Sequence, residues 1–329
     1  MDGPRRRQFL AGAAVLSAGA SHPYRIAFAN ANETPGSHLE GLGFTGADVR
    51  RSFELAARTL PLDIVYYDNA GDPGRAIENA EDAVRQKVDL LIEYNPETSA
   101  ASEIARKLNE AGIPVLAINY PAGGAPLYTC DHHAAGAIAG RALGSFAKET
   151  WSDDTPLAII LGDLGDPSDG VAARIKGVEN GLGAERPSLR PVPLDTGGQP
   201  RRAESLIVKY LAQVPRRKVL IATLDDLTAL SARDGIAVAA RPYDCVIVSH
   251  GLDRSIHGGA NEKKEIDPTN RASAVLGSVA YYLDRYGYEV LPLAMRMLRG
   301  ETVPARTVTR HVLIGGKDVF RDYPPTDMN

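Results

Sequence analysis

The clearest pattern of apolar and polar positions lies between Val84 and Tyr120. Leu90–Ile92 is a short, wholly apolar run, as expected of a parallel strand covered on both faces. Asn95 is placed to cap a helix that has Pro96 at its first position, and Val115–Ile118 predicts the next buried strand. The apolar positions of this helix fall on one face, as in amphipathic helices: Ala101, Ile104, Ala105, Leu108 and Ala111.

The same alternation of strands and helices extends in both directions. Upstream, the pattern predicts a strand at Arg25–Ala29, a helical stripe from Val49 to Leu60, a strand at Asp63–Tyr67 and a helix opening at Asp72. After a glycine- and proline-rich break at 121–126 the alternation restarts, with predicted strands at Leu127–Cys130, Leu157–Leu161, Val192–Leu194, Lys218–Ala222 and Cys245–Val248 and predicted helices at Ala134–Lys148, Val171–Leu182, Arg202–Gln213 and Leu227–Ala232. We therefore predict an α/β protein with two doubly wound parallel-sheet lobes.

The last part of the chain is too short for a third domain. It holds a strand-like segment at Ala272–Tyr281, a helix at Leu291–Arg299 and a last predicted strand at Val308–Leu313. We expect these pieces to complete the two lobes.

Polar side chains follow most of the predicted strands, at Asn30, Asn119-Tyr120, Asp225 and His250. In parallel sheets, ligands bind beyond the carboxyl ends of the strands. A sugar or other polyhydroxylated ligand needs such a lining, because each hydroxyl must exchange its hydrogen bonds to water for bonds to protein. The alternative is that strand tips are polar because they meet solvent. The polar loop from Asn30 to Gly43 is long for a strand–helix connection, and such loops are often functional.

The N-terminus carries the marks of an export signal. Arg5–Leu10 holds a charged Arg-Arg-x-Phe-Leu element, Ala11–Ala20 is weakly apolar, and Ala18-Gly19-Ala20 precedes Ser21 as a small-residue cleavage site. This arrangement is similar to a twin-arginine signal, so we predict a signal peptide over residues 1–22 and a periplasmic mature chain. The alternative is a basic, disordered cytosolic N-terminus.

Composition and charge narrow the function classes. A formal net charge of −4 and the lack of a later basic run give no support to a nucleic-acid partner. No apolar run approaches the roughly 20 residues needed to cross a bilayer. The two cysteines, Cys130 and Cys245, are expected to be separate buried thiols, since their sequence contexts place them in different parts of the fold.

No convincing catalytic signature is present, so we expect a protein that is not an enzyme and needs no cofactor. Asp131-His132-His133 could suggest a metal site, but neighbouring residues rarely point at one ion, and we predict none. Asp225-Asp226 could be paired carboxylates, although a helix cap explains at least one of them.

Several short motifs resemble those of the type I periplasmic solute-binding proteins of ABC importers, especially the ribose-binding group. They are the segment Asn79–Asn95, Ala111-Gly112-Ile113-Pro114-Val115, Ala135-Gly136 with Gly140, Arg174 with Gly177, and Gly251-Leu252-Asp253. The likeness covers about Tyr24 to Leu313. It extends also to the ligand-binding core of the lactose-repressor family, but an export signal stands where a DNA-binding helix pair should lie.

The resemblance implies two lobes that close on one small ligand about a three-crossover hinge. It places the N-terminal lobe at 23–130 plus 282–307 and the C-terminal lobe at 131–281 plus 308–329. The crossings would fall near Cys130–His132, Tyr281 and Thr307–Thr309. With the strand tips, the resemblance gives these expected ligand contacts: Asn30, Phe44, Asn119, Tyr120, His132, Arg174, Asp225, Asp253 and Tyr281.

The chain departs from the sugar-binding proteins that it resembles at the expected contacts. Asn119-Tyr120 stands where an Asp-Arg pair is common, Tyr281 stands where an amide side chain is usual, and Phe44 is the only aromatic near the first loop. The expected function is still capture of a sugar or polyol by a monomeric protein that delivers it to the membrane subunits of an ABC importer. The alternative is a periplasmic sensor that presents the ligand to a receptor or sensor kinase.

Overall fold

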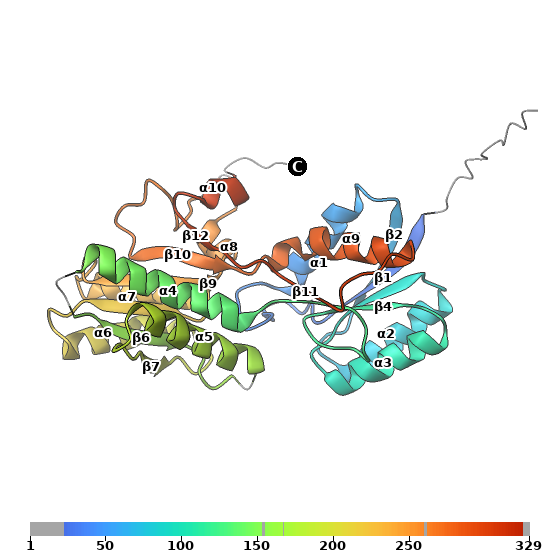
Figure 1. The fold of residues 1–329 in the computed structure, drawn as a ribbon, viewed down its shortest axis with the longest axis horizontal. Coiled ribbons are helices and arrows are strands. Elements are labelled where there is room, and N and C mark those ends of the chain that lie inside the picture. The colour runs from blue at the N-terminus through green and yellow to red at the C-terminus, as the bar shows by residue number, and fades with distance from the viewer. Residues whose placement is uncertain (1–22, 153–154, 167, 260–261, 325–329) are drawn as a thin grey trace, which may run out of the picture.

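Two α/β lobes joined by three chain crossings make up the computed structural model (Figure 1), which describes residues 23–152, 155–166, 168–259 and 262–324. The predicted twin-arginine signal, residues 1–22, lies outside these ranges. In the described part, no helix combines the length and the apolar character needed to cross a membrane.

The N-terminal lobe is built on a parallel sheet in the order β11-β5-β4-β3-β1-β2. Apolar side chains of its central strands point to both faces of the sheet and pack under helices on each side. Helices α1 and α9 pack together, as do α2 and α3. The elements are β1 (Tyr24–Asn30), α1 (Gly46–Ala57), β2 (Leu62–Asp68), α2 (Pro73–Arg85), β3 (Leu90–Tyr94), α3 (Thr98–Glu110), β4 (Val115–Ile118), β5 (Leu127–Thr129), η1 (Leu283–Arg285), α9 (Tyr286–Leu298) and β11 (Arg306–Val308).

The C-terminal lobe repeats this plan with the order β12-β10-β9-β8-β6-β7, in which only β12 is antiparallel to its neighbour. Its elements are α4 (His132–Thr150), β6 (Leu157–Gly162), α5 (Asp169–Glu185), β7 (Val192–Asp195), α6 (Arg202–Gln213), β8 (Val219–Thr223), α7 (Asp226–Val238), β9 (Cys245–Gly251), α8 (Arg254–His257), β10 (Val275–Ala280), β12 (Leu313–Gly315) and α10 (Val319–Asp322). The predicted fold class is confirmed.

The chain passes between the sheets after β5, after β10 and between β11 and β12. The prediction of one last strand at Val308–Leu313 is wrong, because residues 309–312 form the third crossing and the strands on either side belong to different sheets. Thr309 N donates to Thr129 O and Ala280 N donates to Val312 O, so the crossing is bonded to each lobe in turn.

The predicted start of α3 is also wrong. The helix begins at Thr98 with Glu97 as its N-cap, and no side chain caps it. Asn95 Oδ1 instead accepts a hydrogen bond of 2.9 Å from Glu97 N, an Asx turn that precedes the helix. The polar tip of β3 therefore continues two residues further than the sequence pattern indicates.

Helices α4 and α5 approach one another unusually closely because glycines line their contact. A Cβ at Gly136 would lie 2.1 Å from Arg174 O, and one at Gly177 would lie 2.1 Å from His133 O. The backbones of α4 and α5 therefore pack directly on each other, and we call this rigid pair of helices on one face of the lobe the plate. The plate holds the N-terminus of α4 and Arg174 of α5 at the cleft.

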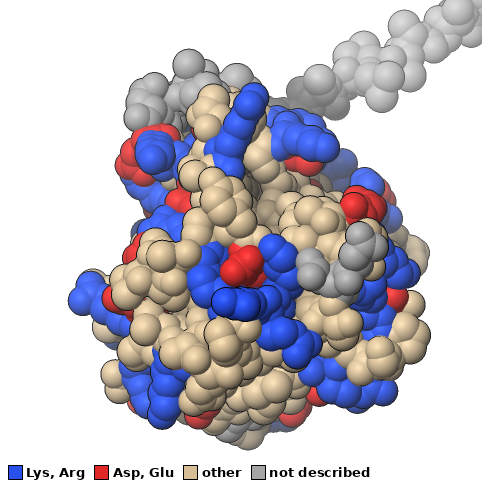
Figure 2. All heavy atoms as spheres, turned by 90° about the vertical axis from the view of Figure 1, so that its left-hand side faces the viewer, with Lys and Arg blue, Asp and Glu red and all other residues tan. Residues whose placement is uncertain are grey.

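Both cysteines are free and buried, one in each lobe, as the sequence predicted. Figure 2 views the molecule from the end of the C-terminal lobe, where Lys and Arg side chains gather. The ion pairs of Asp244 with Lys218 and Arg241, each 3.0 Å, lie at the ends of β8 and β9 where these strands begin.

Candidate functional site

The carboxyl ends of the strands of both lobes face a cleft that contains two cavities. The larger has a volume of about 690 Å³, within the range of about 300–1,000 Å³ that small-molecule sites occupy. It is lined from the N-terminal lobe by residues that include Asn119 and Tyr120, from the first crossing by Cys130 and His132, and from the start of α5. The smaller, of about 280 Å³, lies against the C-terminal lobe and is lined by residues that include Asp163, Thr196 and Asp225.

The tip of the β1–α1 loop, residues 38–43, separates these cavities. Gly41 lines both of them, Glu40 lines the larger, and His38 and Leu42 line the smaller. Leu39 and Leu42 are buried and anchor the tip, while Leu39 N donates to Phe44 O at 2.8 Å and closes it as a small loop. The long loop that we expected to be functional therefore puts a backbone segment in the middle of the cleft.

Glu40 is the residue of this site that sequence reasoning missed. Its side chain is 5 % exposed, and its carboxylate accepts hydrogen bonds from Tyr94 Oη at 2.7 Å, Asn119 Nδ2 at 2.9 Å and Tyr120 Oη at 3.3 Å. Burial alone would raise the pKa of Glu40. The hydrogen bonds that Glu40 accepts from His132, Tyr94 and Asn119 outweigh this effect, so the pKa of Glu40 lies below its usual range.

Arg174 connects the two lobes through this tip. Its guanidinium donates to Glu40 O at 2.9 Å and Gly41 O at 3.3 Å, and to Leu224 O at 2.5 Å within its own lobe. Its Nε donates to Tyr281 Oη at 3.1 Å. Arg174 and Tyr281 are both fully buried, and neither lines a cavity of the cleft.

The structure places the other predicted site residues unevenly. Asn119, Tyr120 and His132 line the larger cavity and Asp225 the smaller one. Asn30 is buried and donates to Gly46 O at 2.8 Å, and Phe44 lies in the hydrophobic core, so neither lines a cavity.

Asp253 lies under the tip of the loop. It is 3 % exposed, and its Oδ1 accepts from Ser255 N, but its buried Oδ2 has no partner. A Cβ at Gly43 would lie 1.9 Å from that Oδ2, so only glycine permits this approach. Burial raises the pKa of Asp253, and it also raises the pKa of Asp225.

One group of side chains in the cleft could hold a metal ion. Glu40, Cys130 and His132 offer a carboxylate oxygen, a sulfur and a nitrogen that all lie within 4.8 Å of one another. These atoms are already partners, with Sγ 3.2 Å and the carboxylate oxygen 3.5 Å from His132 Nε2. Nδ1 of the same ring lies 3.1 Å from Arg174 Nη2, a donor, which favours the tautomer that carries its proton on Nε2 and opposes metal binding there.

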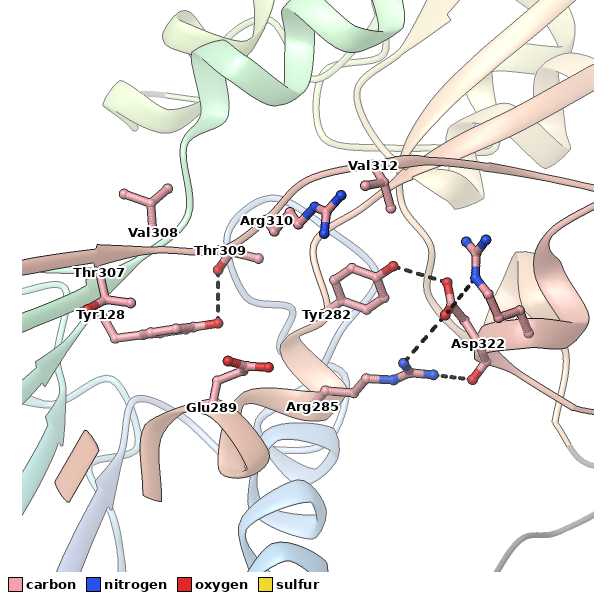
Figure 3. Close-up of a pocket in the computed structure, with 11 residues that line it drawn as sticks. Tyr128, Tyr282, Arg285, Glu289, Thr307, Val308, Thr309, Arg310, Val312 and Asp322 are labelled. Carbon is pink, nitrogen blue, oxygen red and sulfur yellow. Dashed lines mark hydrogen bonds and ion pairs between the residues drawn. The ribbon is translucent and has the colours of Figure 1, made fainter. Parts of the chain in front are cut away.

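A third cavity, of about 530 Å³, lies at the hinge (Figure 3). None of the predicted ligand contacts lines it. Its walls are tied across the crossings, since Tyr282 Oη donates to Asp322 at 3.1 Å and Thr309 Oγ1 to Tyr128 Oη at 3.2 Å. These bonds connect the second and third crossings to the lobes they join.

The comparisons with known proteins agree with this architecture. The chain is similar to the solved structure of GanP, a glucose-galactose binding protein from Geobacillus stearothermophilus, with 20 % identity, a TM-score of 0.63 and coverage of 90 % of this chain and 98 % of that one. An ABC transporter periplasmic solute-binding protein from Actinobacillus succinogenes, solved with bound D-allose, is 14 % identical, with a TM-score of 0.68 and coverage of 91 % and 100 %. A solute-binding protein from Bacillus halodurans, solved with bound myo-inositol, is 16 % identical, with a TM-score of 0.66 and coverage of 92 % and 98 %.

No curated protein matches the chain in sequence. Likeness at these identities shows the fold, and the sequence itself gives the family, because the profile described as "Periplasmic binding protein domain" matches residues 43–302. The resemblance noted from the motifs is confirmed. The chain belongs to the periplasmic binding protein domain family.

Proposed function

We propose that this protein is the exported solute-binding component of an ABC importer and that it binds a neutral sugar or polyol between its lobes. The observation that carries the proposal is the lining of the cleft. Amide, phenol and hydroxyl groups of Asn119, Tyr120 and Thr129 stand beside carboxylates in a cavity large enough for a monosaccharide. Such groups can replace the water around hydroxyls, and the ring of Tyr120 offers a face for a sugar's C–H patch.

The charge of the lining favours a neutral ligand over an anionic one. The larger cavity is lined by Glu40, Glu97, Asp166 and Asp169, and no Lys or Arg is among the described residues that line it. The smaller cavity has Asp163, Asp166 and Asp225 and likewise no described Lys or Arg. Like charges repel, so sugar phosphates and sugar acids are disfavoured in both.

A ligand bound between the lobes would stabilise the closed form relative to the open one. A ligand that touches both lobes only when they are shut favours that state by its differential affinity. The three hinge crossings allow such a movement, and the close contact of α4 with α5 keeps these two helices of the C-terminal lobe together. The solved structures with D-allose and myo-inositol are of proteins with this fold.

A thermal-shift screen followed by calorimetry tests the ligand class. The panel holds neutral sugars and polyols together with sugar phosphates, sugar acids and amino sugars. A neutral polyhydroxylated compound at about 100 times its Kd should stabilise the protein by about 2.7 kcal/mol, and Asn119→Ala should weaken its binding while leaving the protein folded. Binding confined to anionic compounds, or turnover of any hit, would contradict the proposal.

The transport role needs its own test. A strain that lacks this protein should lose uptake of the radiolabelled ligand and regain it with the wild-type chain. Normal uptake together with loss of a transcriptional response to the ligand would favour a sensor instead.

A further inference from the structure

The tip of the β1–α1 loop makes the contacts that a ligand would be expected to make. From the N-terminal lobe, Glu40 receives hydrogen bonds from Tyr94, Asn119 and Tyr120, and from the first crossing it faces His132 Nε2 at 3.5 Å. Four donors from three separate segments, the end of β3, the end of β4 and the first crossing, thus converge on a single carboxylate. Oxygen atoms of a polyhydroxylated ligand would use the same donors.

The C-terminal lobe binds the backbone of the same tip. Arg174 donates to the carbonyl oxygens of Glu40 and Gly41, at 2.9 and 3.3 Å. These bonds join the C-terminal lobe to a segment of the N-terminal lobe. A planar guanidinium that binds two neighbouring oxygens is also suited to ring and hydroxyl oxygens.

The fit of the tip is incomplete. Asp253 Oδ2 is buried against Gly43 without a hydrogen-bond partner. Glu40 itself has a φ of 59°, in the left-handed region that is costly for a residue other than glycine. A ligand hydroxyl could donate to Asp253 and release this backbone conformation, so replacement of the tip has a physical driving force.

We infer that residues 38–43 act as a built-in competitor, which occupies the cleft and holds the lobes together until a ligand displaces Glu40 from its donors. The inference rests on the proposed ligand-binding function, since it concerns the regulation of that site. Its consequence is that the apparent affinity is lower than the affinity of the uncovered site, by the fraction of molecules in which the tip has left.

The first experiment needs no ligand. Small-angle X-ray scattering of the purified protein in EDTA should give a compact particle whose radius of gyration does not fall when ligand is added. Glu40→Ala should increase this radius, and the charge-matched control Glu78→Ala should not, because Glu78 is exposed on α2 and lines no cavity of the cleft. An open wild-type protein without ligand would overturn the inference while leaving the proposed function intact.

The second experiment measures the Kd of the best neutral hit by calorimetry. Glu40→Ala should bind about tenfold more tightly than wild type, a gain of about 1.4 kcal/mol, with Glu40→Gln between them and Glu78→Ala unchanged. A weaker Glu40→Ala would show that Glu40 contacts the ligand, and an unchanged Kd would show that the tip does not compete. Either result overturns the inference.

Two controls distinguish displacement of the tip from unfolding and from metal binding. Thermal melts of each variant establish that it is folded, and Glu40→Gln keeps the size of the side chain if Glu40→Ala unfolds. Scattering repeated with zinc in place of EDTA tests the group of Glu40, Cys130 and His132. Compaction only in zinc would mean that a metal, not the tip by itself, joins the lobes, which also overturns the inference.

Discussion

Replacing Glu93 by glutamine should remove a pH dependence of stability that the structure places in the N-terminal lobe. Glu93 lies on β3, is 1 % exposed, and has one carboxylate oxygen that receives only a 3.3 Å hydrogen bond from Asn69 and one with no partner. Burial raises its pKa from 4.5 to about 8, and the nearby side-chain amides of Asn95 and Asn69 offset only part of that shift.

The sign follows from proton linkage. Between pH 4.5 and about 8 the folded protein keeps a proton on Glu93 that the unfolded chain has released. The free energy of unfolding therefore falls as pH rises through this window. At about 1.4 kcal/mol per pKa unit, the difference between 4.5 and about 8 sets a ceiling of about 5 kcal/mol.

Urea unfolding of wild type and Glu93→Gln at pH 5 and pH 8 measures the effect. We expect similar stabilities at pH 5, and at pH 8 a variant more stable than wild type by about 2–4 kcal/mol. Glu78→Gln, on an exposed position of α2, serves as the control and should track wild type at both values. A difference between Glu93→Gln and wild type that stays constant with pH would refute the reasoning.

Three further predictions concern packing, thiols and export. Gly177→Ala should destabilise the protein by about 1–3 kcal/mol, because its Cβ would meet His133 O at 2.1 Å. The control Gly183→Ala, on the same helix, has nothing within 4 Å of its Cβ and should stabilise the protein by about 0.5–1 kcal/mol. Equal melting temperatures of the two variants would contradict the backbone contact. Burial raises the pKa of the Cys130 and Cys245 thiols, so Ellman's reagent at pH 8 should modify neither until the protein is unfolded in urea, and fast reaction of the folded protein would contradict their burial. Lysines in place of Arg6 and Arg7 should leave the precursor in the cytoplasm. N-terminal sequencing of the wild-type protein from its native host should give a mature chain that begins near Ser21, and an intact N-terminus would contradict the signal.

Much of the fold could be predicted from local patterns. Runs such as Leu90–Ile92 and Val115–Ile118 are buried on both faces, so their composition alone marks them as parallel strands. The start of α3 could not be predicted from local patterns. Asn95-Pro96 has the residues of a helix cap, but Asn95 accepts a hydrogen bond from Glu97 N in a turn that precedes the helix. Both hydrogen-bond patterns use the same residues, so no local signal in the sequence distinguishes them.

The candidate site was predictable in outline and not in its central residue. Asn119 and Tyr120 could be predicted as site residues because they follow a strand, and the geometry of a parallel sheet brings the ends of its strands to one edge. Glu40 stands in a loop without periodicity, and its role comes from partners 54 to 92 residues away, from Tyr94 to His132. A single acidic residue between two buried leucines, Leu39 and Leu42, is the signal that could have drawn attention to it.

The closure of the loop tip upon itself has a consequence for how this protein could change over evolution or by engineering. An antiparallel bridge between His38 and Thr45 and the bond from Leu39 N to Phe44 O shut the tip off from the strand and helix on either side. Its six residues therefore form a cassette outside both sheets, in which Leu39 and Leu42 are kept for the core and Gly43 for its contact with Asp253 while the remaining positions vary. Libraries restricted to this cassette could retune ligand preference and the threshold for response together, which suits the scaffold to reporter proteins for small molecules.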